Sequence, residues 1–235
     1  MSALISFADE LDHQINVCSQ SACQQLVYCA ETGARALTNA VFLLGAYLIL
    51  RLDMTPDGVA QVLNGLDPTM IATFRDATFI RQDFGLTLQD CWRGLYKGKD
   101  SGWVAAPSDP SDPLWGMIDP DEYRHYESPA QGDLHEVVPG KIIAFRGPAD
   151  LRGSNFVDKS SGCRDFAPEH YAGIFKDFGV STVIRLNEPR YDGEAFRRCG
   201  IEHFDLEFED CTSPPNHIAV AFLRIVHRCL TREDS

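Results

Sequence analysis

The sequence lacks the features that mark secreted, metal-binding and membrane-spanning chains. No C-x-x-C pair occurs among its eight Cys, which stand at 18, 23, 29, 91, 163, 199, 211 and 229. The first ten residues have no basic segment of the kind that opens a secretory signal. The longest apolar run, 40–50, is shorter than the roughly 20 residues that cross a bilayer. We therefore expect reduced thiols, no metal site, a cytoplasmic or nuclear location, and a buried helix at the apolar run.

Positive charge is also scarce. The chain has 21 Lys and Arg against 34 Asp and Glu, a formal net charge of −13. Such a surface repels phosphate backbones and anionic lipids, which argues against nucleic acid and membranes as partners. It favours basic peptides, although a merely solubilising surface gives the same balance. The length of 235 residues and the 44% hydrophobic share fit one large or two small globular domains, and no oligomeric state is predicted.

The first half of the chain is predicted to be mostly helical. Residues 24–29 predict a short buried strand, and a turn then leads into an apolar helix over 37–52. A second helix is expected over 55–66, with Thr55 as N-cap and proline in its first turn. A third is expected over 87–98.

The second half is predicted to alternate strands and helices. Residues 101–120 carry four Pro and several Ser and Asp, which marks a connection, and a short helix follows at 121–127. Strands are then expected at 142–145, 182–186 and 202–204, and helices at 168–178, 192–199 and 215–229. This alternation predicts an α/β fold with a largely parallel sheet.

Several segments carry a family likeness. In the second half these are PGKIIAFRGP and the run FAPEHYAGIFKDFGVSTVIRLNEPRYDGEAFRRCGIEHFDLEFEDCTSPP. In the first half they are NAVFLLGAYLILRLDMTP, FRDATF and LTLQDCWRGLYKG, and DEYRHYE lies between the halves. Over roughly 24–228, in order and with few gaps, the chain resembles the cell division cycle fourteen family of dual-specificity (tyrosine) protein phosphatases.

The resemblance implies an α/β architecture of two tandem phosphatase-like domains. Residues 1–118 would form the non-catalytic N-terminal domain, 119–133 a linker helix, and 134–235 a catalytic domain that is truncated before its catalytic loop. The implied substrates are phosphoproteins, as phosphoserine or phosphothreonine before proline and as phosphotyrosine. No cofactor is implied, because the family attacks phosphorus with a cysteine thiolate.

Asp210 takes the position of the family's general acid. It lies in FEDCTSPP, on a loop after a strand, and an acid is needed there to protonate the leaving oxygen as its bond to phosphorus breaks. Glu209 is an alternative. The plainer interpretation of Asp210 is a loop carboxylate that caps the helix at 215.

The cysteine loop that follows in the family is missing from these 235 residues. That loop reads His-Cys-x5-Arg, so that thiolate, backbone N–H groups and Arg surround one phosphate. His227, Arg228, Cys229 and Arg232 supply the letters in the wrong order, and we interpret them as a helix end and tail. The chain is therefore predicted to be inactive as it stands. The alternatives are a non-catalytic phosphopeptide-binding module or an incomplete gene product.

The absent loop also has a structural consequence. In phosphatase-like folds the strand that leads into it lies in the sheet interior, beside strands such as 182–186. Its absence exposes backbone groups and apolar faces. We expect residues 135–235 to be marginally stable alone, unless the tail or another chain supplies a strand.

The first half contains a weaker version of the motif. Cys29 and Arg35 satisfy Cys-x5-Arg between an apolar segment and a long helix. Tyr28 replaces the expected His, Ala36 replaces a hydroxyl, and Glu31 brings negative charge toward a phosphate dianion. In the family this loop does not catalyse, which makes Cys29 a buried vestige, although Arg35 could still hold an anion.

A third candidate site is the acidic linker. In the family it favours substrates with a basic residue after the Ser-Pro, and the matching residues here are Asp121, Glu122, Glu127 and Asp133. Arg124 replaces an expected acidic residue and weakens this site. A solvated helix face is the competing interpretation.

Arg185 and Asn187, at the end of a predicted strand, are interpreted as structural, because a charged residue there often braces the neighbouring loop.

Overall fold

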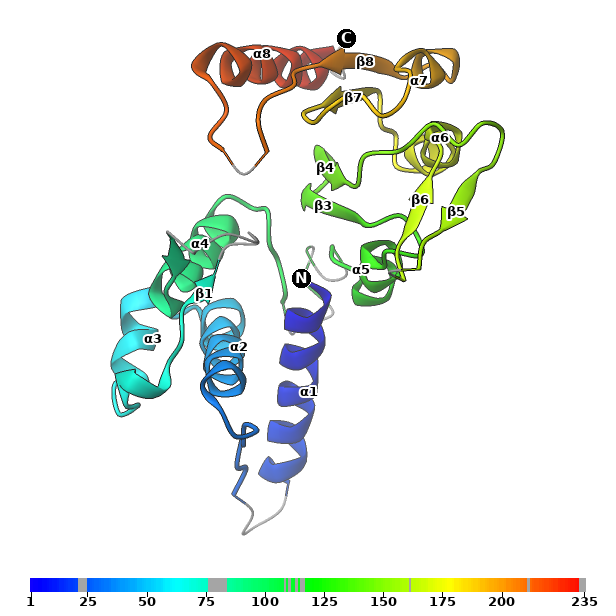
Figure 1. The fold of residues 1–235 in the computed structure, drawn as a ribbon. Coiled ribbons are helices and arrows are strands. Elements are labelled where there is room, and N and C mark those ends of the chain that lie inside the picture. The colour runs from blue at the N-terminus through cyan, green and yellow to red at the C-terminus, as the bar shows by residue number, and fades with distance from the viewer. Residues whose placement is uncertain are drawn as a thin grey trace. The chain divides into compact units, whose positions relative to one another are not determined.

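The computed structural model describes residues 1–235 except 21–24, 76–83, 108, 110, 113, 115, 116, 161, 211 and 233–235. Two compact units are formed, residues 1–124 and residues 125–235. The division falls inside helix α5 (Pro120–Glu127), and both units can be followed in Figure 1.

The first unit is built mainly from helices, as the sequence predicted. Its described elements are α1 (Ser2–Ser19), α2 (Ala34–Leu52), α3 (Pro56–Val62), the 3-10 turn η1 (Pro68–Met70), α4 (Leu88–Asp100) and the antiparallel pair β1 (Phe74–Arg75) and β2 (Gly85–Leu86). Helix α1 was not anticipated. It buries Leu4, Ile5 and Ala8, an i, i+4 stripe that faces the apolar core of this unit.

Helix α2 is the core helix of the first unit. By length and composition alone it could cross a membrane, but its apolar side chains have protein partners. One set packs with α1, and the other packs with α3 and α4; the buried members are Leu4, Ile5, Val41, Ala46, Ile49, Leu50, Val59, Trp92 and Ala106. The predicted buried helix at the apolar run is confirmed.

The helix starts predicted from cap residues are confirmed. The Thr55 hydroxyl accepts a hydrogen bond from the backbone N–H of Gly58 at 3.2 Å, and α3 begins at Pro56. Thr87 and Asp90 form a reciprocal capping box, with N–H to oxygen distances of 3.0 and 3.2 Å. Both signals are local, which is why the sequence reveals them.

The predicted buried strand at 24–29 is wrong for its described part. Residues 25–30 are irregular and exposed, and Val27 keeps 68% of its surface in solvent. Gln24 lies outside the described residues. A strand needs a partner for its backbone groups, and none of the described strands pairs with this segment. The Tyr28 ring instead contacts the Phe7 ring, with centroids 5.3 Å apart.

The described part of the second unit has four strands after α5 and then alternates helices and strands. Its described elements are β3 (Leu134–Val138), β4 (Ile142–Phe145), β5 (Phe156–Asp158), β6 (Arg164–Phe166), α6 (Pro168–Asp177), β7 (Thr182–Arg185), α7 (Glu194–Arg198), β8 (Glu202–Asp205) and α8 (Asn216–Arg232). All predicted strands and helices of this half are confirmed, with boundaries shifted by at most a few residues. The tail around Cys229 is helical, also as predicted.

The prediction of a largely parallel sheet is wrong. Only β7 and β8 pair in parallel among the described strands, whereas β3–β4 and β5–β6 are antiparallel pairs. Strands β3, β5 and β6 were not predicted, and they form the antiparallel hairpins. A short turn at Gly140, with φ of 65°, joins β3 to β4, and so short a connection permits only antiparallel pairing.

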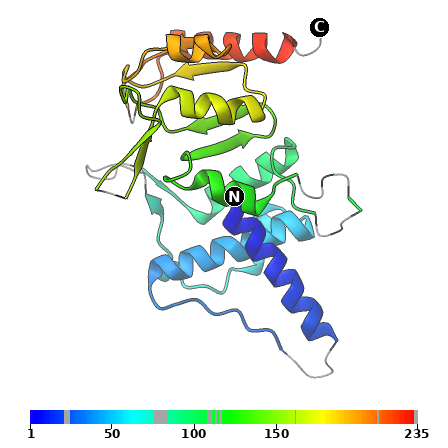
Figure 2. The same cartoon turned by 90° about the vertical axis from the view of Figure 1, so that its right-hand side faces the viewer.

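Helices cover both faces of the parallel pair, as Figures 1 and 2 show. On one face Val183 of β7 joins a core with α6 and α7, whose buried members include Leu134, Phe166, Tyr171, Phe175, Tyr191, Phe196 and Ile201. On the other face α8 contacts both strands. The Cys229 thiol lies 3.3 Å from the Thr182 hydroxyl, and Arg228 pairs with Glu202 at 2.9 Å.

Candidate functional site

The second unit contains a cavity of about 540 Å³. Its walls are β4 on one side and β7 on the other, and half-buried side chains of α8 complete the lining. Sites of a few hundred to a thousand Å³ with mostly apolar walls and a few polar groups are typical of ligand binding. This cavity is the best candidate for a functional site among the described residues.

Asp210 belongs to the lining of this cavity. It lies on the loop between β8 and α8, five residues beyond the end of β8, and its side chain is exposed. The neighbouring Glu209 is also exposed, and its backbone carbonyl accepts a hydrogen bond from the Thr212 hydroxyl at 2.6 Å. The structure therefore places the predicted acid at a cavity with access to solvent.

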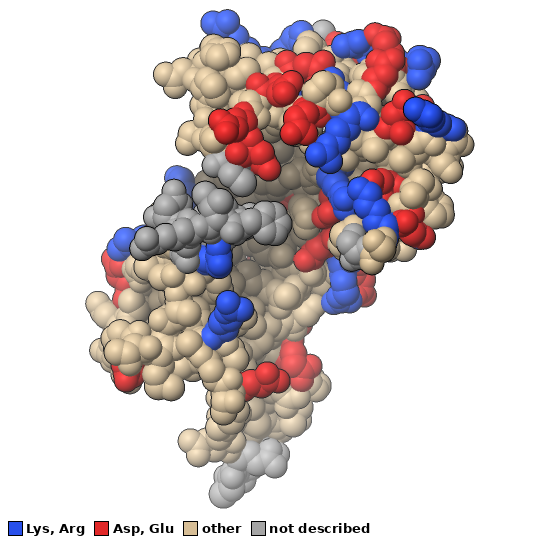
Figure 3. Space-filling model, in the orientation of Figure 1, with Lys and Arg blue, Asp and Glu red and all other residues tan. Residues whose placement is uncertain are grey.

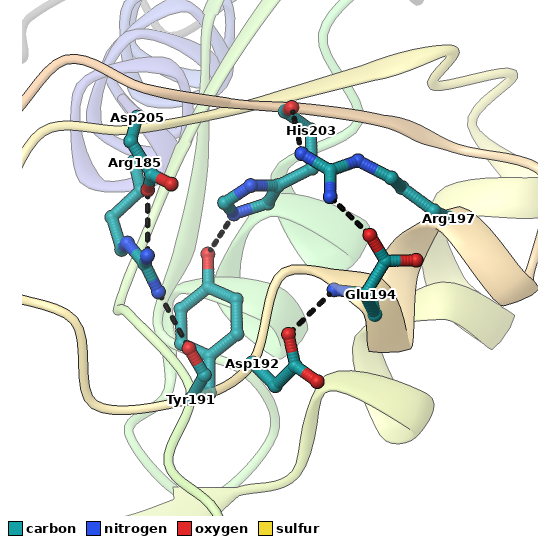
Figure 4. Close-up of polar contacts among 7 residues, drawn as sticks. All are labelled: Arg185, Tyr191, Asp192, Glu194, Arg197, His203 and Asp205. Atoms are coloured by element: carbon teal, nitrogen blue, oxygen red, sulfur yellow. Dashed lines mark hydrogen bonds and ion pairs between the residues drawn. The ribbon is translucent and has the colours of Figure 1, made fainter.

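A polar cluster braces the loop after β7, as Figure 4 shows. The Arg185 guanidinium donates to the Tyr191 carbonyl at 2.6 Å, pairs with the Asp205 carboxylate at 2.6 Å, and lies 4.7 Å from the centre of the Tyr191 ring. The structural role predicted for Arg185 is thus confirmed. Because Arg185 also lines the cavity, this bracing fixes part of the cavity wall.

The same cluster holds a buried histidine that the sequence motifs did not indicate. His203 is 3% exposed, and its Nε2 lies 2.9 Å from the Tyr191 hydroxyl. Among the described residues its Nδ1 has no hydrogen-bond partner, and a Cβ on Gly193 would stand only 2.5 Å from that nitrogen. Alternation along β8 puts residue 203 on the buried face, but the tyrosine partner could not be read from sequence.

Burial sets the ionisation of this pair. It lowers the pKa of His203, and Arg185 and Arg197 lower it further, whereas Asp205 and Asp192 act in the opposite direction. Burial likewise raises the pKa of Tyr191 to about 12. Both side chains are therefore neutral near pH 7, as expected for buried groups packed against the Phe196 ring.

The lowered pKa of His203 predicts acid sensitivity of the second unit. In the unfolded chain, residue 203 takes up a proton near the ordinary histidine pKa of about 6.5, whereas in the folded chain its lowered pKa delays this uptake. The contribution of His203 to the free energy of unfolding is therefore fully present above about pH 6.5 and is lost as the pH falls below it. The lowered pKa of His170, caused first by burial and then by Arg164, adds in the same direction. We expect hydrogen exchange in β7 and β8 to quicken between about pH 7.5 and pH 5.5 after correction for intrinsic rates.

His203→Gln should reduce this pH dependence, and His217→Gln is the matched control, because His217 is exposed on α8. Equal pH dependence in the wild type and the His203→Gln variant would contradict the assignment to His203.

The prediction that Cys29 is buried is wrong. Cys29 is exposed and lies in the irregular segment before α2. Arg35 is exposed in the first turn of α2, whose N-cap is Gly33 with φ of 119°. The two residues keep the spacing of the motif, but none of the described strands pairs with the segment that carries Cys29.

Two of the acidic linker residues pair with basic side chains of the same chain. The Asp121 carboxylate pairs with Arg124 at 2.6 Å, and the Asp133 carboxylate lies 3.7 Å from Nε2 of His135. Glu122 and Glu127 are exposed on α5. Figure 3 shows basic side chains interspersed among the acidic ones on the visible face of residues 125–235, rather than one acidic field.

Comparisons with known proteins agree with the motifs. Residues 1–98 match the family described as "Dual specificity protein phosphatase, N-terminal half". Human dual specificity protein phosphatase CDC14A is 36% identical over 192 residues, which cover 81% of this chain and 30% of the relative. Human CDC14C is 34% identical over 202 residues, with coverage of 86% and 42%. The chain is a relative of the CDC14 dual specificity phosphatases.

The relationship extends to distant organisms. Tyrosine-protein phosphatase CDC14 of Saccharomyces cerevisiae is 29% identical over 220 residues, which cover 94% of this chain and 38% of the yeast protein. The aligned part therefore spans only about 30–42% of the length of these CDC14 relatives. What the whole relatives do comes to this chain only as a proposal.

Proposed function

We propose that this chain supplies the substrate-recognition unit and the proton donor of a dual-specificity protein phosphatase, and that its 235 residues do not hydrolyse phosphate esters by themselves. The substrates are phosphoserine or phosphothreonine followed by proline, and phosphotyrosine, in proteins of the cytoplasm or nucleus. Residues 1–118 act as a non-catalytic phosphatase-like domain, 119–133 as the linker, and 134–235 as a partial catalytic domain.

The observation that carries this proposal is the position of Asp210. A proton donor must reach the leaving oxygen of a bound ester, and Asp210 combines solvent exposure with a place in the cavity lining. We therefore assign the role of general acid to Asp210 rather than to Glu209, because Glu209 does not line the cavity.

We expect no hydrolysis because none of the cysteines in the described part of the chain is placed to act as the attacking thiolate. Cys29 is the one cysteine of the sequence with Arg six positions later. A thiolate nucleophile requires a fixed loop whose backbone N–H groups face the phosphate, whereas Cys29 lies exposed in an irregular segment. Cys211 and Cys229 have His217 and Ser235 at that spacing.

A second candidate function is a non-catalytic module that binds basic phosphopeptides. It is supported by the exposed carboxylates Glu122 and Glu127 on α5, which would attract a basic residue of the peptide. This function needs no nucleophile at all.

Hydrolysis of an aryl phosphate tests the proposal. We expect the purified chain and its Cys29→Ser variant to release 4-nitrophenol at the same rate as buffer, since neither provides an activated thiolate. Turnover by the wild-type chain that disappears in Cys29→Ser would overturn the proposal. Lack of turnover together with binding of a basic Ser-Pro phosphopeptide, lost in a Glu122→Gln, Glu127→Gln double variant, would support the binding module instead.

A further inference from the structure

A hydroxyl residue directly precedes proline at three places in the sequence. These pairs are Thr55-Pro56, Ser128-Pro129 and Ser213-Pro214. A hydroxyl before proline is what proline-directed protein kinases modify, but the kinase must also bind the flanking backbone in an extended form. The surroundings of each pair in the folded chain therefore decide which of the three a kinase can reach.

The pair Thr55-Pro56 is built into the start of a helix. The Thr55 hydroxyl accepts a hydrogen bond from the N–H of Gly58 at 3.2 Å, and Pro56 is buried in the first turn of α3. A kinase that recognises the proline can bind this pair only after the start of α3 has unfolded.

The pair Ser128-Pro129 lies in a turn that is held from several sides. Ser128 is half-buried, and its hydroxyl accepts a hydrogen bond from the N–H of Ala130 at 3.4 Å. Its carbonyl accepts from the N–H groups of Gln131 and Asp133, at 2.9 and 3.1 Å. Arg164 donates to the Ala130 carbonyl at 3.3 Å. An extended backbone at Ser128 would break these bonds, so this pair is also closed to a kinase unless the turn opens.

The pair Ser213-Pro214 has the opposite surroundings. It lies in the connection between β8 and α8 (Figure 1), and Ser213, Pro214 and Pro215 are all exposed and belong to no helix or strand. Ser213 and Pro214 each precede a proline, which disfavours the helical backbone region and favours an extended one. The segment is therefore both accessible and already biased toward the backbone form that a kinase binds.

We propose that Ser213 is a phosphorylation site for proline-directed protein kinases. In the transfer, the bond between the terminal phosphorus of ATP and its bridging oxygen breaks, and a bond forms from that phosphorus to Oγ of Ser213. The hydroxyl proton passes to the catalytic aspartate of the kinase, and ADP leaves. The product is a serine phosphate monoester, which adds a charge of about −1.5 to −2 near pH 7.

The new phosphate would add to negative charge that is already present on this loop. Glu207, Glu209 and Asp210 precede Ser213 and are exposed. Like charges repel one another, so a phosphate on Ser213 would oppose the approach of a second phosphate group to Asp210. This regulatory consequence rests on the proposed function, whereas the modification of Ser213 does not.

Site mapping after kinase treatment tests the proposal. The full chain and three short peptides, one centred on each pair, are incubated with ATP and a proline-directed kinase that modifies all three peptides. Mass spectrometry then gives the initial rate at each hydroxyl. We expect the rate in the chain divided by the rate in the peptide to be close to one for Ser213. For Thr55 and Ser128 this ratio should be at least about tenfold smaller, because they react only in the fraction of chains that has opened locally.

Variants of the chain provide matched controls. Ser213→Ala should remove most of the incorporated phosphate, and Pro214→Ala should do the same although it keeps the hydroxyl. Ser128→Ala, which removes the other serine of a Ser-Pro pair, should leave incorporation unchanged.

A ratio for Ser213 as small as that for Ser128 would overturn the proposal, as would equal incorporation into the wild type and Ser213→Ala. The comparison with peptides uses the wild-type chain, so it decides the question even where a variant fails to fold. Phosphate incorporation requires no hydrolysis by the chain, so this result is independent of the aryl phosphate test of the proposed function.

Discussion

Replacing Phe196 by alanine is expected to lower the free energy of unfolding of residues 125–235 by about 3–5 kcal/mol. The Phe196 side chain is fully buried. It stacks on Phe175 and His203, each with centroids 6.0 Å apart, and meets the Tyr191 ring edge-on at 5.6 Å. Truncation removes these contacts and leaves a cavity between rigid rings. Since a domain is stable by only about 5–15 kcal/mol, this loss would be a large part of the total.

Hydrogen exchange on the full chain measures this effect where it arises. Amides of β7 and β8 should exchange faster in Phe196→Ala, while those of α2 and α4 in the first unit should not change. The matched control is Phe156→Ala on β5, because Phe156 is 45% exposed and its loss should cost less than about 1 kcal/mol. A similar acceleration in both variants would show that Phe196 is not the centre of this core.

Gly45→Ala is expected to destabilise the first unit, although alanine is the better helix former. A Cβ at this position of α2 would stand 2.3 Å from Cε2 of Trp92. The indole cannot easily move, since it is 4% exposed and its Nε1 donates to the Phe42 carbonyl at 3.3 Å. Overpacking of this kind costs about 1–3 kcal/mol, more than the gain of about 1 kcal/mol from replacing a helical glycine.

Tryptophan fluorescence during urea unfolding measures this change, because all three Trp of the sequence lie in residues 1–124. Gly94→Ala is the matched control in α4. Apart from its chain neighbours and the backbone of its own helix, a Cβ built there has no atom within 4 Å, so this variant should gain about 0.5–1 kcal/mol from helix propensity. A Gly45→Ala variant as stable as Gly94→Ala would contradict the close contact between α2 and Trp92.

The sequence predicted what local chemistry determines. Thr87 and Asp90 define the start of α4 within four residues, and the apolar run 142–145 forms β4 with the predicted bounds. The expected strand at 24–29 failed because a strand depends on a partner that is remote in sequence. The contact of Gly45 with Trp92 likewise joins two helices, and no pattern within either helix reveals it.

The candidate site was predictable to a similar extent. The family likeness pointed to Asp210, and the predicted strand at 182–186 marked where a neighbouring strand would be expected. The cavity itself could not be predicted, since it requires β4, β7 and α8 to be placed in space. The Tyr191 and His203 pair was missed for the same reason, because the two side chains lie on different elements.

We propose that none of these 235 residues attacks phosphorus, and a trapped covalent intermediate would reveal any residue that does. The purified chain would be incubated with an aryl phosphate, quenched in acid, and examined by mass spectrometry for a phosphoryl group on cysteine, since a thiolate phosphatase passes through a phosphocysteine. We expect every cysteine to stay unmodified. A phosphoryl group on Cys29 that forms and decays during turnover would contradict it.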